Sequence, residues 1–172
     1  MPTYYLGACI YSEPEDSLRS DLLQRTGVDV PKLHWRDMTT HVKQRAISAV
    51  TSYEPTFVVV ALRPMVSMSQ ERARGKCFEY LLPLLEQQYG VAHLFMESRE
   101  KTQDKKDIAL IQGLRSRHYI DTLRVDFRSG KEDARLWPAD LLLGALGDME
   151  HTLQSPDYAI QDMLHEYTIS GK

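Results

Sequence analysis

ARLWPADLLLGALGDME, residues 134–150, predicts a helix with one apolar face. The apolar side chains that recur at i, i+4, i+7 and i+11 form a single helical stripe: Leu142, Leu146, Met149 and Leu153. Pro138 suits a first helical turn, because an N–H there has no intrahelical partner. Asp140 falls in the same turn, where the helix dipole stabilises a negative charge. The acid at this position either complements the dipole or serves a function at this end of the helix.

Upstream of this helix, strand and helix patterns alternate. The β-branched run TFVVVAL, residues 56–62, is typical of a strand buried on both faces. Further strands are predicted over 3–11, 91–97 and 120–127, with a short extended piece over 32–35. Helices are predicted from Ser12 or Ser17 to about 24, from Asp37 or Thr39 to 54, and over 69–89, 104–117 and 157–165. Pro83 predicts a kink or break in the third of these helices. The alternation indicates a single α/β domain, 1–172, with a mixed sheet flanked by helices.

The composition is that of an ordinary globular protein. The 172 residues are 42% hydrophobic and 26% charged, and the net charge is −3. No apolar run approaches the roughly 18 residues that span a bilayer, so no membrane association is expected. The start lacks the pattern of a secretory signal, and Cys9 and Cys77 have no metal-binding or redox spacing. A cytoplasmic protein is the expectation, and any nucleic-acid binding must use a local basic patch.

Three acids are expected at one end of the sheet. Glu97 closes the strand VAHLFME, Asp126 lies near the close of LRVDF, and Asp140 begins the next helix. Ligands of α/β sheets bind beyond the carboxyl ends of the strands, where these acids meet if the two strands are parallel neighbours. Clustered carboxylates favour Mg²⁺ or Mn²⁺, and two such ions can activate water for phosphodiester hydrolysis. The alternative is that the strand-end acids pair with Arg99, Arg124 or Arg128.

The segments LHWRD, FMESR, VDFR and LWPADLLLGAL, in this order, resemble the bacterial DUF3800 proteins of the ribonuclease H-like superfamily. The resemblance covers nearly the whole chain, and its strongest piece is the pair Ala139-Asp140. It implies a ribonuclease H-like fold and a two-metal nuclease site with Glu97, Asp126 and Asp140 as metal ligands and catalytic acids.

The family's usual first strand, with its Asp-Glu-Ser-Gly-like motif, has no counterpart in this sequence. Glu13, Glu15 and Asp16 follow the first strand and are interpreted as a solvated turn. Three explanations stay open: an inactive member, a chain whose true start lies upstream, or a site that a partner completes. The strand 3–11 is then an exposed edge, where a second copy or a partner protein is expected.

Other candidate residues are basic or aromatic. His34 falls where the family often has a histidine, and it is expected either to contact substrate or to pack beside Trp35. Arg99 and Arg128 are candidates for contacting a substrate phosphate. Lys105 belongs to a basic stretch that either grips a nucleic-acid backbone or is a solvated helix face. His93, inside an apolar strand, is expected in the core.

The sequence therefore predicts a divergent metal-dependent nuclease that acts on nucleic acid. The alternative is a catalytically inactive binding or assembly module with the same fold. A small-molecule phosphohydrolase that uses the same acids is a third hypothesis.

Overall fold

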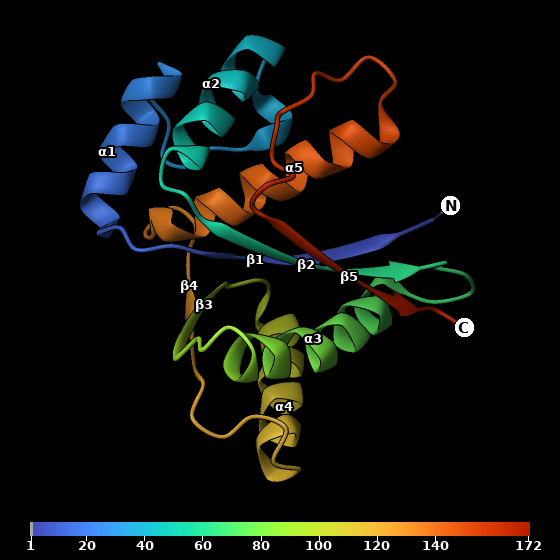
Figure 1. The fold of residues 1–172 in the computed structure, drawn as a ribbon. Coiled ribbons are helices and arrows are strands. Elements are labelled where there is room, and N and C mark those ends of the chain that lie inside the picture. Colours follow the sequence, from blue (N-terminus) through green and yellow to red (C-terminus); the bar gives the residue numbers. More distant parts are fainter. Residues whose placement is uncertain (1) are drawn as a thin grey trace. The chain divides into compact units, whose positions relative to one another are not determined.

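A computed structural model describes residues 2–172 of the chain (Figure 1). The helices are α1 (Glu15–Thr26), α2 (Thr40–Thr51), α3 (Gln70–Gln87), α4 (Lys101–Ser116) and α5 (Trp137–His151). The strands are β1 (Tyr4–Ile10), β2 (Thr56–Arg63), β3 (His93–Glu97), β4 (Arg124–Arg128) and β5 (Leu164–Ser170). Two short 3-10 helices are η1 (Trp35–Asp37) and η2 (Ala134–Leu136). The chain is thus a mixed α/β protein, as its alternating patterns predict.

The strands form two small sheets. One has the order β1-β2-β5, and the other consists of β3 and β4, which run parallel. The two strands that carry Glu97 and Asp126 are therefore parallel neighbours, the condition under which these acids lie at one end of a sheet, and β1 is an edge strand within the described sheet. The ribonuclease H-like arrangement stays a prediction. No helix within residues 2–172 is long and apolar enough to cross a membrane.

The contacts of the chain divide it into two compact units. Unit 1 comprises residues 1–6, 59–128 and 166–172, and contains α3, α4, β3 and β4. Unit 2 comprises residues 7–58 and 129–165, and contains α1, α2, α5 and both 3-10 helices. The strands β1, β2 and β5 contribute residues to both units.

The core of unit 1 follows from the alternation of side chains along β3 and β4. Met96 is buried, and Leu94, Val125 and Phe127 pack against the same apolar cluster. The buried members of this cluster are Phe78, Leu82, Met96, Ile111, Leu114, Ile120 and Leu123. Because side chains alternate between the faces of a strand, the other residues of β3 and β4 lie on the opposite face. The candidate site lies there.

The core of unit 2 confirms the helix at 134–150. Leu142 and Leu146 of α5 are buried, with Leu141 and Ala145 beside them. Pro138 and Asp140 lie in the first turn of α5, as predicted. Gly144 permits a close approach, since a Cβ there would lie 2.3 Å from Cγ of Trp35.

Four details of the sequence interpretation are wrong. Residues 157–165 form no helix: Ala159 has a positive φ of 55°, and the chain then enters β5, where Tyr167 and Ile169 favour a strand. Leu153 lies beyond the end of α5 and is fully exposed. The extended piece at 32–35 leads directly into η1. Helix α3 continues through Pro83, so the predicted break is absent, whereas the alternative of a kink stays a prediction.

Candidate functional site

The open face of β3 and β4 carries six side chains from two strands in parallel register. His93 is opposite Arg124, Phe95 opposite Asp126, and Glu97 opposite Arg128. Each pair lies on the face opposite Met96 and Phe127, which contact the core of unit 1. We refer to His93, Phe95, Glu97, Arg124, Asp126 and Arg128 as the polar face.

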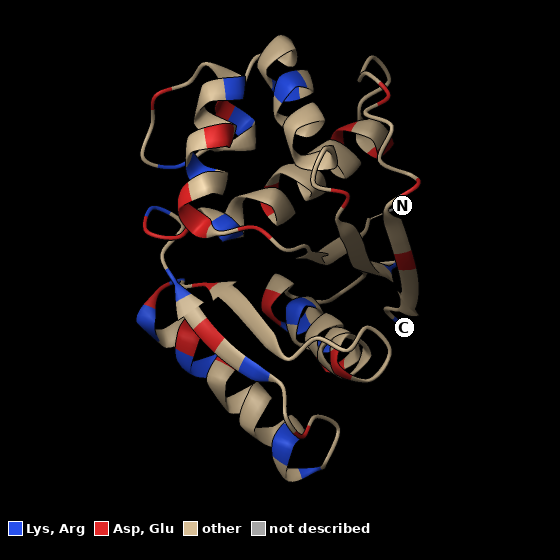
Figure 2. Ribbon diagram, turned by 60° about the vertical axis from the view of Figure 1, so that its left-hand side comes forward, with Lys and Arg blue, Asp and Glu red and all other residues tan. Residues whose placement is uncertain are grey.

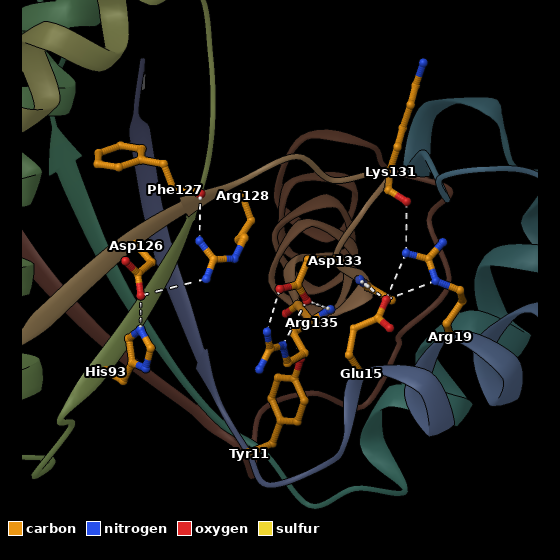
Figure 3. A network of polar contacts seen from close by, with 11 residues as sticks. Tyr11, Glu15, Arg19, His93, Asp126, Phe127, Arg128, Lys131, Asp133 and Arg135 are labelled. Carbon is orange, nitrogen blue, oxygen red and sulfur yellow. Dashed lines mark hydrogen bonds and ion pairs between the residues drawn. The ribbon is translucent and has the colours of Figure 1, made fainter.

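Asp126 is surrounded by two guanidinium groups and an imidazole. Its Oδ2 atom lies 2.6 Å from Nε2 of His93, 3.1 Å from Nε of Arg124 and 4.0 Å from Nη2 of Arg128. The hydrogen bond with His93, followed by the charges of the two arginines, lowers the pKa of the Asp126 carboxyl. Figure 3 shows the contacts with His93 and Arg128. The ion pairing that the sequence leaves open as an alternative is therefore present for Asp126.

An aromatic ring lies among these charges. The rings of His93 and Phe95 are 4.2 Å apart, and the guanidinium of Arg128 lies 5.7 Å from the centre of the Phe95 ring. The side chains of His93, Arg124 and Arg128 are 35%, 70% and 41% exposed. The prediction of His93 as a core residue is wrong, because the residue lies on the open face of its strand. The polar face thus exposes two guanidinium groups beside a half-buried aromatic ring.

Two other candidates of unit 1, Arg99 and Lys105, lie outside the polar face. Arg99 binds Glu71 and Asp107, whose Oδ1 lies 2.9 Å from Nη2 of Arg99, rather than Glu97 or Asp126. Lys105 is exposed on α4, where acidic and basic residues are interspersed (Figure 2). Glu97 is exposed at the end of β3. Only Glu97, Asp126 and Arg128 of the predicted site share the polar face.

Two further candidates belong to unit 2. Asp140 is exposed in the first turn of α5. His34 is exposed and precedes η1, so the interpretation as a packed histidine is wrong; its neighbour Trp35 is buried instead. Asp148 of α5 accepts hydrogen bonds from Nε1 of Trp35 at 3.0 Å and from Lys43 at 2.9 Å, which gives this acid a structural role.

The turn at Glu15 is not solvated as predicted. Glu15 accepts a hydrogen bond of 3.0 Å from the backbone N–H of Ala134 and pairs with Arg19. The bond from Ala134 lowers the pKa of the Glu15 carboxyl. The buried carboxylate of Asp133 accepts hydrogen bonds from the guanidinium group of Arg135 (Figure 3). These acids of unit 2 stabilise η2.

The surroundings of Asp126 do not fit a divalent cation. Two guanidinium groups already compensate its charge, and they would repel a metal ion at the same oxygen. Within residues 2–172, no three His, Cys, Asp or Glu side chains are arranged to hold a metal ion. The Mg²⁺ or Mn²⁺ centre therefore stays a prediction.

The sequence interpretation missed His93 and Phe95 as site residues. The signal was their period of two with Glu97, which places all three on one face of a strand. The apolar character of the segment hid this alternation.

In comparisons with known proteins, no family model, curated protein or solved structure matches this chain. The resemblance to DUF3800 proteins stays a prediction.

Proposed function

We propose that this protein binds single-stranded nucleic acid through the polar face without cleaving it. The observation that carries the proposal is the grouping of Phe95 with Arg124 and Arg128 on one open sheet face. Proteins that bind single strands combine cations that contact the backbone with aromatic rings on which bases stack. The polar face has both components.

In this proposal, five residues of the polar face have a role in binding. Arg124 and Arg128 contact phosphates, since guanidinium groups bind phosphate oxygens in a bidentate manner. Phe95 stacks against a base. His93 and Asp126 hold the two strands and the two arginines in register through their 2.6 Å contact. In this proposal Asp126 is a positioning residue and not a metal ligand.

A second candidate function is the metal-dependent nuclease that the sequence predicts. One observation favours it: Glu97 and Asp126 lie on the same face of adjacent parallel strands. In that function Glu97, Asp126 and Asp140 ligate the metal ions, with His34 contacting substrate. The ion pairs of Asp126 favour the first candidate.

Fluorescence anisotropy with labelled single-stranded RNA and DNA of about twelve nucleotides tests the first candidate. We expect Arg124→Gln/Arg128→Gln to weaken binding and to reduce the slope of log Kd against log salt by about 0.7 for each phosphate that is no longer neutralised. Phe95→Leu is expected to weaken binding at every salt concentration. Arg36→Gln/Arg72→Gln removes the same charge from exposed positions outside the polar face and serves as the control. Equal weakening by both double variants would refute the proposal.

A cleavage assay separates the two candidates. The wild type, Asp126→Asn and Asp140→Asn are incubated with the same RNA and DNA in Mg²⁺ or Mn²⁺. The binding function predicts no cleavage and a tighter complex with Asp126→Asn, because the variant loses a negative charge from the polar face. Metal-dependent cleavage that both substitutions abolish would establish the nuclease instead.

A further inference from the structure

A second cationic surface lies in unit 2, between α1 and α2. A hollow of about 400 Å³ is lined by Arg25 of α1 and by four residues of α2: His41, Gln44, Arg45 and Ser48. We refer to it as the α1–α2 groove. The four residues of α2 are spaced i, i+3, i+4 and i+7, which places them on one face of the helix.

The groove combines several donors for an anion. Two guanidinium groups, an imidazole, an amide and a hydroxyl line it, and its lining contains no acid. Helix α2 has no acidic residue at all, and His41 lies in its first turn, where the helix dipole favours negative charge. The lining therefore presents hydrogen-bond donors to an anion from both helices.

His41 and Arg45 of α2 are available to a ligand. Within the described residues, 2–172, His41 and Arg45 have no hydrogen-bond or ion-pair partner, and both side chains are exposed. Arg45 lies against the end of α1, with Nη1 3.7 Å from the position of a Cβ on Gly27. Arg25 is fixed by Oγ of Ser52 at 2.9 Å and by Asp21 at 3.4 Å. One guanidinium is thus held in place while the other can close on a ligand.

We propose that the α1–α2 groove binds the phosphate group of a nucleotide or of an oligonucleotide end. Paired arginines bind phosphate oxygens bidentately, and a volume of about 400 Å³ falls in the range of small-ligand sites. The lining has no aromatic side chain except His41, so recognition depends on the phosphate and not on the base. This site is separate in its residues from the polar face and does not depend on the proposed function.

Isothermal titration calorimetry with four probes tests the proposal: pyrophosphate, AMP, a 5′-phosphorylated tetranucleotide and the same tetranucleotide with a 5′-hydroxyl. We expect saturable binding of the phosphorylated probes and a roughly tenfold weaker Kd for Arg45→Gln and for His41→Gln. If the tetranucleotide binds more tightly than AMP with its 5′-phosphate but not with a 5′-hydroxyl, the ligand of the groove is an oligonucleotide end. Equal affinities for AMP and the phosphorylated tetranucleotide identify a mononucleotide phosphate.

Two controls keep the test specific. Arg36→Gln removes an exposed cation of unit 2 that lies outside both the groove and the polar face, and it is expected to keep the wild-type affinity. Thermal midpoints establish that every variant is folded. The absence of saturable binding by any phosphorylated probe, or the same Kd for wild type, Arg45→Gln and His41→Gln, overturns the proposal.

Discussion

His93 and Asp126 are joined across two parallel strands, with Nε2 of the imidazole 2.6 Å from Oδ2 of the carboxylate. In the strand register His93 is opposite Arg124 and Asp126 is opposite Phe95, so the contact is diagonal. It connects the amino-terminal end of β3 to the middle of β4. The same oxygen also lies near both arginines of the polar face.

Acid should destabilise the protein partly through Asp126. The hydrogen bond with His93 and the two arginines lower the pKa of this carboxyl in the folded state. A lowered folded pKa contributes stability that is present above the ordinary pKa, about 3.9, and is lost as the pH falls through the folded value. We expect urea midpoints measured from pH 5 to pH 2.5 to fall less steeply for Asp126→Asn than for the wild type. Urea midpoints that fall equally steeply with pH in the two proteins would contradict this role of Asp126.

Asp107 is the least exposed acid in the ion-pair network of unit 1. Its side chain is 6% exposed and pairs with Nη2 of Arg74 at 3.2 Å and with Nη2 of Arg99 at 2.9 Å. Asp107→Ala leaves two mostly buried guanidinium groups without this partner, and we expect a decrease of about 2–4 kcal/mol in the free energy of unfolding. Chemical denaturation measures it. Asp162→Ala, at an exposed position, should change stability by less than about 0.5 kcal/mol.

Gly144 and Gly147 provide a matched pair in α5. A Cβ on Gly144 would lie 2.3 Å from Cγ of Trp35, whereas a Cβ on Gly147 meets nothing within 4 Å. We expect Gly144→Ala to destabilise the protein by about 1–3 kcal/mol through overpacking. The same change at Gly147 should stabilise it by about 0.5–1 kcal/mol, because alanine favours a helix interior.

Tryptophan fluorescence during denaturation reports both glycine substitutions. Gly144→Ala must displace the Trp35 ring and should disturb its 3.0 Å hydrogen bond to Asp148, so the native emission should change. Gly147→Ala should keep the native emission of the wild type. Equal effects of the two substitutions would show that α5 approaches Trp35 less closely than described.

Both thiols should be unreactive in the native protein. Burial raises the pKa of Cys77 to about 11 and that of Cys9 to about 12, so almost no thiolate is present near neutral pH. We expect Ellman's reagent at pH 8 to label neither cysteine before unfolding and both in guanidinium chloride. Rapid labelling of one thiol in the native state would place that cysteine at the surface.

Much of the secondary structure could be predicted from local patterns. The β-branched run of β2 is buried from Phe57 to Leu62, as a strand covered on both faces requires. Ser69 caps α3 by accepting a hydrogen bond from the N–H of Arg72, at the predicted start of that helix. The terminal strand β5 was missed, because the positive φ of Ala159 that ends the apparent helical pattern is not visible in a sequence.

The candidate site could be predicted only in part. The acids Glu97 and Asp126 were predicted at strand ends, and the parallel pairing and register of their strands, which the sequence left as a condition, place both on one face. Arg124 and Arg128 share the face of Asp126 through the period of two along β4, but the contact of Asp126 with His93 depends on the register, because a shift of one residue would move Asp126 to the other face. His93 was assigned to the core because the apolar character of its segment hid the alternation.

By itself the sequence determined the apolar helix at 134–150 with Asp140 in its first turn, and the buried strand at 56–62. Both depend on hydrophobic period and local capping, which act between near neighbours in the chain. Only the tertiary structure decided that Asp126 pairs with His93, that Arg99 pairs with Asp107, and that Arg25 and Arg45 line one groove. These contacts arise from strand register and helix packing, which a local sequence pattern does not encode.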